Sequence, residues 1–292
     1  MEKPNILGLT VEELAKYCRA KRLPAFRARQ VYTWLHKRLA QNFDEMTDVS
    51  KEIRQLLAED FSLDLPVVEK IQKSGDGSQK YLFRYSDGAR IESVLMKTID
   101  GRKTVCLSTQ VGCALGCVFC ATAKMGLKRD LSAAEIIGQA YAVARRDPDL
   151  TNLVYMGMGE PFLNYDNVLK SIAILTSDRG PNFGQRRITV STCGIPEGII
   201  KFAGEDTQVR LAVSLNTADD NLRRELMPID RRFPLPDLRQ AVRYYINKTG
   251  RRVTLEYIMI EGINDSAEAL NELIDFCHGL NVGINLIPLN AA

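Results

Sequence analysis

From Gly101 onward, short apolar segments alternate with helical patterns, and this alternation constrains the fold more than any other feature of the chain. Strands are expected near residues 104–109, 152–158, 187–192, 209–215, 253–260 and 283–289. Helices are expected between them, over 165–177, 236–248 and 266–278 and after a capping-box pair at Ser132 and Glu135. Such alternation predicts an α/β fold with a parallel sheet, either open and doubly wound or closed into an incomplete (β/α) barrel. In both architectures, reactive side chains gather at the carboxyl ends of the strands.

The first hundred residues follow a different pattern. Thr10 and Glu13 form a capping box, apolar residues recur at helical spacing through Trp34, and a third helix is expected over 50–59. Strand candidates then follow, separated by turn signals at 74–77 and 87–88. The sequence therefore predicts a basic helical module (1–62), a small β meander (63–100) and an α/β core (101–292).

The composition indicates a folded protein without a membrane span. Hydrophobic residues make up 45% and charged residues 26% of the 292 positions. No apolar run approaches the roughly 18 residues that a membrane helix needs, and the first ten residues lack a signal-peptide core. The cytoplasm is therefore the expected compartment. The net charge of +3 is uneven, because residues 1–40 carry nine Lys or Arg against three Glu; this segment either contacts nucleic-acid phosphates or is a solvated helix face.

Three of the seven cysteines, Cys113, Cys117 and Cys120, fall within eight residues after the first expected strand of the core. Crowded thiols in an odd-numbered set favour metal binding in a reducing compartment over a disulfide framework. A C-x3-C-x2-C loop can bind three irons of a [4Fe–4S] cluster and leave the fourth iron open. Structural zinc is the alternative, but it requires a fourth ligand, and His36 and His278 are distant in sequence. The spacing therefore favours a cluster.

This spacing, with Phe119 before the last cysteine, resembles the signature of the radical S-adenosylmethionine (SAM) superfamily, whose members bind SAM at the open iron. Other segments resemble one family within it, the adenosine carbon-2 methyltransferases of large-subunit ribosomal RNA and transfer RNA. These segments are VCLSTQVG (105–112), GMGEP (157–161), STCG (191–194), SLN (214–216) and INLIP (284–288). The resemblance runs in order from the N-terminal helices to the last residue. It implies a partial (β/α)6 radical-SAM barrel.

The resemblance also implies which residues bind SAM. Gly159 and Glu160 would take its amino group. Its carboxylate, ribose or adenine would be contacted by Ser191, Ser214, Leu215, Asn216 and Asn290. The family often has His at the position of Asn216, and a contact made by the backbone would be unaffected by this difference. In isolation, a Gly-x-Gly-Glu-Pro turn would be a plain strand-to-helix connection; several such turns beside the cysteine loop favour a binding site.

Two residues gain a catalytic role only through the resemblance. Cys106 would otherwise be assigned to the core, and Glu92 to a solvent-facing strand. In the family, the cysteine at the position of Cys106 resolves a covalent enzyme–RNA intermediate by a transient disulfide with a second cysteine, and the glutamate matching Glu92 is the proposed proton acceptor. That second cysteine carries the methyl group and lies some tens of residues beyond Asn290, whereas this sequence stops at Ala292. We therefore expect the core to lack the family's C-terminal segment.

The resemblance implies an RNA methyltransferase that acts on carbon 2 of adenosine, in 23S ribosomal RNA at the peptidyl-transferase centre and in tRNA next to the anticodon. It would use two SAM molecules, a methyl-cysteine intermediate and an electron donor such as flavodoxin. We expect a monomer that does not bind membranes. Two alternatives stay open at this point: carbon-8 methylation of 23S ribosomal RNA, which gives antibiotic resistance, and a non-catalytic RNA-binding iron–sulfur protein.

Overall fold

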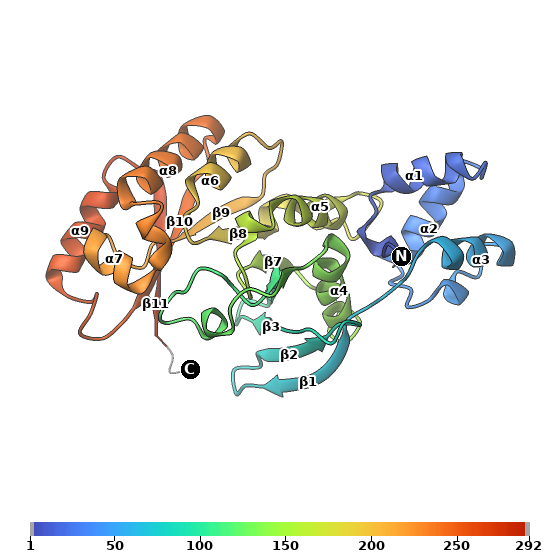
Figure 1. The fold of residues 1–292 in the computed structure, drawn as a ribbon, viewed down its shortest axis with the longest axis horizontal. Helices are drawn as coiled ribbons and strands as arrows, with labels where there is room; N and C mark the ends of the chain where they lie inside the picture. The colour runs from blue at the N-terminus through green and yellow to red at the C-terminus, as the bar shows by residue number, and fades with distance from the viewer. Residues whose placement is uncertain (1–2, 290–292) are drawn as a thin grey trace. The chain divides into compact units, whose positions relative to one another are not determined.

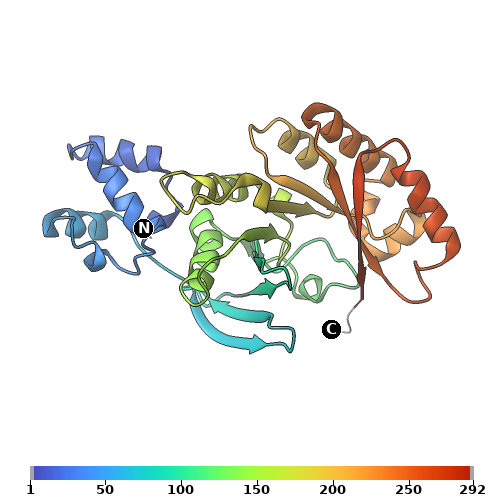
Figure 2. The same cartoon turned by 180° about the vertical axis from the view of Figure 1, so that it is seen from behind.

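The computed structural model describes residues 3–289, which form two compact units (Figures 1 and 2). Unit 1 consists of the chain up to Thr109 together with Asp130–Leu153 and Asp166–Gly184. Unit 2 consists of Gln110–Arg129, Val154–Tyr165 and the chain from Gln185 onward. The helical module and the β meander therefore belong to unit 1, and the cysteine loop belongs to unit 2.

Unit 1 begins with a set of short helices, as the sequence predicts. They are η1 (Ile6–Gly8), α1 (Val11–Ala20), α2 (Phe26–His36), η2 (Phe43–Glu45) and α3 (Lys51–Asp60). The predicted capping box is present at α1, where the Glu13 N–H donates to the Thr10 hydroxyl and the Thr10 N–H donates to the Glu13 carboxylate. Leu14, Val31 and Leu35 are buried between the helices, which gives this module its own apolar core.

The meander of unit 1 is an antiparallel sheet whose strands pair in chain order. Its strands are β1 (Val67–Lys73), β2 (Gln79–Arg84), β3 (Arg90–Lys97) and β4 (Lys103–Cys106). Both predicted turns lie between strands, at 74–78 and 85–89. In β3, Ile91, Ser93 and Leu95 are buried while the intervening residues are half-buried, so one face packs on the core and the other is open. The strand β4, expected as the first of the α/β alternation, pairs antiparallel with β3.

Two longer helices complete unit 1: α4 (Ala133–Ala144) and most of α5 (Tyr165–Thr176). The predicted capping box at Ser132 and Glu135 begins α4. Because nearly every residue of α4 is buried, this helix forms the centre of the unit's core rather than its surface. The short strand β7 (Asn152–Tyr155) contributes residues to both units.

Unit 2 is built on four parallel strands, β8 (Ile188–Thr192), β9 (Arg210–Ser214), β10 (Val253–Met259) and β11 (Val282–Pro288). Each is connected to the next through helix, and Figure 1 shows these helices beside the strands: α6 (Pro196–Ala203), α7 (Asp220–Leu226), α8 (Leu235–Thr249) and α9 (Ala267–Cys277). The remaining elements are short: β5 (Gln110–Val111), η3 (Ala121–Met125), β6 (Arg129–Asp130), η4 (Pro161–Leu163), η5 (Gln185–Arg187) and η6 (Pro228–Arg231). The parallel arrangement places four carboxyl ends at one edge.

All six strands predicted for the core are present, but two end about three residues earlier than the apolar runs suggest. β4 ends at Cys106 rather than near residue 109, and β7 ends at Tyr155 rather than near 158. Beyond their last ladder hydrogen bonds these segments form turns that include Gly159, at a φ of 97°. The sequence analysis also missed α6 and α7, because 8 and 7 residues give too few turns for a clear helical period.

Among residues 3–289, none of the helices combines the length and the apolar character needed to cross a membrane.

Candidate cluster and SAM site

The cysteine loop follows β5 and is closed by its own backbone. Gly112 has a φ of 78°, and a Cβ at this position would lie 1.8 Å from the carbonyl oxygen of Gly126. Only glycine allows so close an approach of two backbone segments. At the base of the loop, the Lys128 N–H donates to the Val111 carbonyl at 2.9 Å. Residues 112–127 therefore form a ring held by main-chain contacts, and the three cysteines are carried on it.

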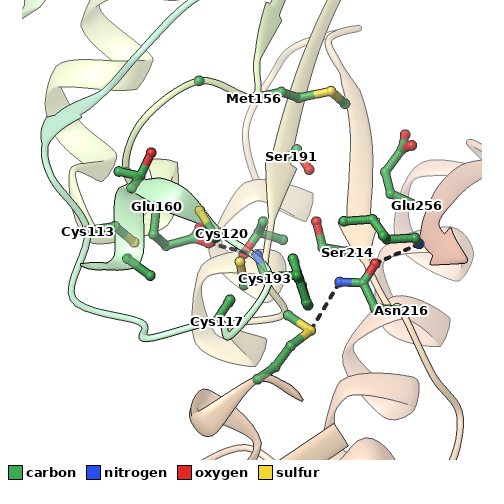
Figure 3. Close-up of a pocket in the computed structure, with 18 of the residues that line it drawn as sticks. Cys113, Cys117, Cys120, Met156, Glu160, Ser191, Cys193, Ser214, Asn216 and Glu256 are labelled. Atoms are coloured by element: carbon green, nitrogen blue, oxygen red, sulfur yellow. Dashed lines mark hydrogen bonds between the residues drawn. The ribbon is translucent and has the colours of Figure 1, made fainter. Parts of the chain in front are cut away.

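The three cysteines line a cavity of about 250 Å³ that lies within unit 2 (Figure 3). Opposite the loop, the walls come from the carboxyl ends of the parallel strands, including Ser191 of β8 and Ser214 of β9. Met156, Ile258 and Ile287 supply apolar wall. The expectation that the turns after these strands would meet the cysteine loop is thus matched by the geometry.

The residues on the loop fit a cubane better than a single ion. Among the described residues, no group of three or more His, Cys, Asp or Glu side chains is arranged to hold one metal ion. A [4Fe–4S] cluster makes a different demand, because each thiolate binds a separate iron at a separate corner. Three thiols spread along the wall of a cavity meet that demand, and neither His36 nor His278 is among the residues that line it.

The thiols of this loop differ in how readily they ionise. Burial raises the pKa of Cys113 to about 11. A hydrogen bond with the Cys193 thiol lowers the pKa of Cys117, and the Arg223 guanidinium adds to this effect. Metal ligation requires thiolates, so metal binding at this loop has to release protons.

Glu160 lines the site and is held by hydrogen bonds to the protein. Its side chain is only 1% exposed. The carboxylate accepts a hydrogen bond from the Phe162 N–H at 3.0 Å and another from the Cys193 N–H at 2.7 Å, and its own N–H donates to Gln110 Oε1 at 2.8 Å. Burial raises the pKa of Glu160. Hydrogen bonds with the Thr192 and Cys193 side chains act on the carboxylate as well, so donors of the protein already use most of its about four acceptor positions.

The neighbouring Gly159 allows this arrangement. A Cβ at Gly159 would come within 2.8 Å of the Gln110 backbone nitrogen, in addition to its positive φ. Glycine at this turn therefore lets the strand β7 segment pass close to the base of the cysteine loop.

The other expected SAM contacts are placed as follows. Ser191 and Ser214 line the cavity at the ends of β8 and β9, and Asn216 lines it just after β9 (Figure 3). The Asn216 amide already donates to the Met227 sulfur at 3.2 Å and accepts from the Ile258 N–H at 3.0 Å. Leu215 is fully buried and is not among the residues that line the cavity. Asn290 lies outside the described residues.

An ion pair that the sequence analysis missed holds the turns of the site together. Arg223 and Asp230 are both fully buried and pair at 2.7 Å. The same guanidinium donates to the Cys193 carbonyl at 2.9 Å and to the Leu215 carbonyl at 3.3 Å. Arg223 thus joins the turn after β8 to the turn after β9. Nothing in the spacing of the sequence distinguishes it from the adjacent Arg224.

A second missed residue is Glu256 of β10, which lines the cavity and is largely buried. Its carboxylate accepts a hydrogen bond from the Asn285 amide at 2.6 Å. Burial raises its pKa. A carboxylate within the apolar run 253–260 was the available signal, because buried strands seldom hold a charge without a function or a partner.

The two expected catalytic residues lie in unit 1, on neighbouring strands. Val94 of β3 is opposite Cys106 of β4, and side chains two positions apart on a strand share a face. Glu92 and Cys106 therefore occupy the same, open face of the antiparallel sheet. On this face Glu92 also pairs with Lys80 of β2 at 3.1 Å. Lys80 was not singled out from the sequence, because its position depends on the register of the β2–β3 hairpin.

Two family models match the chain. The model of the radical SAM superfamily matches residues 107–277, and the model of the ribosomal RNA large subunit methyltransferase N-terminal domain matches residues 4–63. The crystal structure of a radical SAM methyltransferase from Sphaerobacter thermophilus superimposes with a TM-score of 0.95, at 46% identity, over 99% of this chain and 86% of that chain. This likeness confirms the expected radical-SAM fold class.

Curated relatives show the same relationship over nearly all of this chain. The probable dual-specificity RNA methyltransferase RlmN of Heliobacterium modesticaldum is 47% identical over 99% of this chain and 78% of its own length. The corresponding protein of Dictyoglomus thermophilum is 44% identical over 98% of this chain and 83% of its own length. The chain therefore belongs to the radical SAM superfamily and, within it, to the RlmN family of RNA methyltransferases.

Proposed function

We propose that this protein methylates carbon 2 of an adenosine in 23S ribosomal RNA and in transfer RNA, with SAM as both methyl donor and radical source. The observation that carries the proposal is that Cys113, Cys117, Cys120 and Glu160 line one cavity. Relatives that are 44% and 47% identical carry the name dual-specificity RNA methyltransferase. The position of the methyl group follows from that family.

We propose that the three cysteines hold a [4Fe–4S] cluster. When bound, the cluster supplies the electron for reductive cleavage of SAM. The chain contributes the ligands and part of the surroundings, since Met156, Ile258 and Ile287 would give a radical apolar neighbours in place of water. The closed backbone ring of the loop keeps the thiols on the cavity wall.

The proposed SAM contacts divide between charged and neutral groups. Glu160 would accept a hydrogen bond from the SAM amino group, which would share the carboxylate with, or displace, the Thr192 and Cys193 side chains that also hydrogen-bond to it. An approaching ammonium also favours the ionised carboxylate and so opposes the effect of burial on its pKa. Ser191 and Ser214 are hydroxyl donors toward the SAM carboxylate or ribose. The Asn216 amide is already bonded on both sides, and the N–H groups of Leu215 and Asn216 both donate to the Glu256 carbonyl. We therefore propose that SAM meets Leu215 and Asn216 through a remaining lone pair of their carbonyl oxygens or through van der Waals contact.

Proton transfer and release of the product are assigned to the open face of the unit 1 sheet. Glu92 would take a proton from the RNA base on a carboxylate oxygen, and Lys80 would hold that carboxylate in place. Cys106, on the same face, would be the thiol that frees the RNA by forming a disulfide. Their common face supports a shared role, because two side chains that act on one base must lie within reach of each other.

We propose that the helical module holds the RNA by its phosphates. Of its basic residues, Lys21 pairs with Asp60 and Arg38 pairs with Asp48 and lies over Trp34. Within the described part of the chain, seven exposed cations of the module form no ion pair: Lys3, Lys16, Arg19, Arg22, Arg29, Lys37 and Lys51. Such unneutralised charge is what phosphate binding requires.

Charge reversal tests this assignment. In the variant Arg19→Glu/Arg22→Glu, the slope of log affinity for ribosomal RNA against log salt should fall by about 0.7 to 0.9 for each lost contact. The matched control is Arg243→Glu/Lys248→Glu, on the exposed part of α8, which changes the net charge equally. Equal losses in the two variants would mean that net charge, and not the helical module, determines affinity.

The proposal places the reaction in the cytoplasm, with an electron donor protein such as flavodoxin and the enzyme acting as a monomer. The decisive experiment incubates the natural protein anaerobically with SAM, a reductant and a ribosomal RNA fragment. We expect 5′-deoxyadenosine together with 2-methyladenosine, identified by mass spectrometry and NMR. Methylation at carbon 8 would contradict the proposed position, and RNA binding without SAM cleavage would contradict catalysis.

A further inference from the structure

Unit 2 has a second hollow, away from the cysteine loop. It has a volume of about 270 Å³ and is lined by Arg186, Gln208, Arg210, Arg251, Arg252 and Thr254. Arg210 is the first residue of β9, Arg252 directly precedes β10, and Arg186 lies two residues before β8. This arginine hollow is therefore at the amino ends of the strands, whereas the cysteine cavity is at their carboxyl ends. None of its lining residues belongs to the site described above.

The strand register brings two of these arginines side by side. Ala212 of β9 pairs with Thr254 of β10 in a parallel ladder, so Arg210 and Arg252, each two residues earlier, are neighbours. Adjacent strands are only about 4.8 Å apart, and like charges directly beside each other on a sheet destabilise it. The folded protein therefore carries a destabilising electrostatic repulsion between these two arginines.

The ion pairs of residues 3–289 do not offset that repulsion. Among the described residues, no carboxylate forms an ion pair with any of the four arginines of the hollow. This contrasts with Arg223 of the same unit, which pairs with Asp230. Arginines without a carboxylate at close quarters generate a positive potential that attracts an anion.

Part of the hollow is rigid. One Arg251 nitrogen, Nη1, donates to the carbonyls of Thr207 and Val209 at 2.6 and 3.0 Å, and its guanidinium lies over the Tyr245 ring. The Arg252 guanidinium lies against Gly283, where a Cβ would be 3.3 Å from its central carbon. Because these two groups are held by backbone and ring contacts, a ligand meets a partly preorganised surface.

We propose that the arginine hollow binds a phosphate group. Guanidinium groups match phosphate oxygens bidentately and keep their charge at all physiological pH values. Several arginines converging with the Gln208 amide and the Thr254 hydroxyl offer more donors than the two oxygens of a carboxylate can accept, and a tetrahedral phosphate has more oxygens to receive them. The phosphate comes either from an RNA backbone or from a free phosphate ester, since both present the same oxyanion.

The test compares the unaltered protein with Arg210→Gln/Arg252→Gln, using three probes at equal ionic strength. The probes are inorganic phosphate followed by 31P NMR line width, acetate as a competitor, and a fluorescent single-stranded RNA followed by anisotropy. We expect phosphate affinity to fall at least tenfold in the double variant, and acetate to compete poorly against phosphate. The variant Arg210→Lys/Arg252→Lys keeps the charge without the guanidinium fork and should lose part of the affinity.

The matched control is Arg243→Gln/Lys248→Gln, which removes two exposed cations of α8 and should leave phosphate binding unchanged. A parallel loss of RNA affinity in the hollow variant, but not in the control, would identify an RNA phosphate as the ligand. Loss of phosphate binding alone would identify a free phosphate ester. Unchanged phosphate affinity in Arg210→Gln/Arg252→Gln, or equal competition by acetate, would overturn the proposal.

Discussion

The two ends of the strands in unit 2 differ in whether their charged side chains are buried and paired. At the carboxyl ends, Glu160 and Arg223 are buried, and each is bonded to groups of the protein itself. At the amino ends, Arg210 and Arg252 are exposed and adjacent, without a carboxylate partner in the described part of the chain. Burial forces the first set to find partners during folding. Exposure leaves the second set available to an anion from solution.

This difference predicts which substitutions should affect folding and which should affect mainly ligand binding. Removing a buried charge leaves its partner as an unpaired buried charge and affects folding as well as binding. Removing an exposed cation changes ligand affinity and salt dependence, with little effect on the fold. The predictions below test this division, beginning with the carboxyl ends.

The largest effect is expected from the cysteine loop. Replacement of Cys113, Cys117 or Cys120 by Ala should abolish cluster binding and SAM cleavage, because each iron corner needs its own thiolate. Iron content, visible absorbance and 5′-deoxyadenosine formation after anaerobic reconstitution measure this. Cys277→Ala, in the helix α9, is the control and should keep about four irons per chain. A loop variant that retained iron and cleavage would show that other ligands hold the metal.

The next largest effect concerns stability. Arg223→Ala should lower the free energy of unfolding by about 3–5 kcal/mol, because the buried Asp230 would keep only the longer contact to the partly exposed Arg224, at 3.6 Å. Urea unfolding of the protein measures this value. Arg224→Ala, which removes a partly exposed partner of the same carboxylate, should cost at most about 1 kcal/mol. Similar losses in the two variants would mean that the burial of Arg223 does not matter.

A smaller effect is expected from Glu256 and depends on pH. Burial raises the pKa of Glu256 above its ordinary value of 4.5, so the folded state holds the proton more tightly than the unfolded state. The stability contributed by this proton is complete below pH 4.5 and is lost as pH rises through the raised pKa. The denaturation midpoint should therefore fall with rising pH relative to that of Glu256→Gln. For Glu225→Gln, on the exposed side of α7, the denaturation midpoint should change with pH in parallel with that of the unaltered protein. A difference in midpoint between Glu256→Gln and the unaltered protein that does not change with pH would refute the prediction.

The smallest effect is expected at the amino ends. In buffer without phosphate, Arg210→Gln/Arg252→Gln should change the unfolding free energy by no more than about 0.5 kcal/mol. The sign should be stabilising, because the variant removes repulsion between adjacent cations. A loss of several kcal/mol would mean that these arginines hold the fold together, and the contrast between the two ends would no longer stand.

The strands of the core could be predicted because each is a continuous apolar run between turn residues, and all six exist in the structure. The three cysteines could be predicted because they lie within one short segment. Contacts that depend on the fold could not be predicted from the sequence. Arg223 is distinguished from Arg224 only by its buried ion pair with Asp230. Lys80 contacts Glu92 only because of the register of the β2–β3 hairpin. The arginine hollow was hidden for the same reason, since its members are spread from residue 186 to residue 254.

The closed ring of the cysteine loop has a consequence for how the metal's binding free energy is used. In zinc fingers, metal binding and folding are a single event, and much of the metal's binding free energy is used to order the chain. Here protein contacts also constrain the loop, through the close approach of Gly112 to the Gly126 carbonyl and the hydrogen bond from the Lys128 N–H to the Val111 carbonyl. Part of the entropy cost of closing the loop is then met by these main-chain contacts rather than by the metal. A larger share of the metal's binding free energy should accordingly remain for holding the cluster than in a zinc finger.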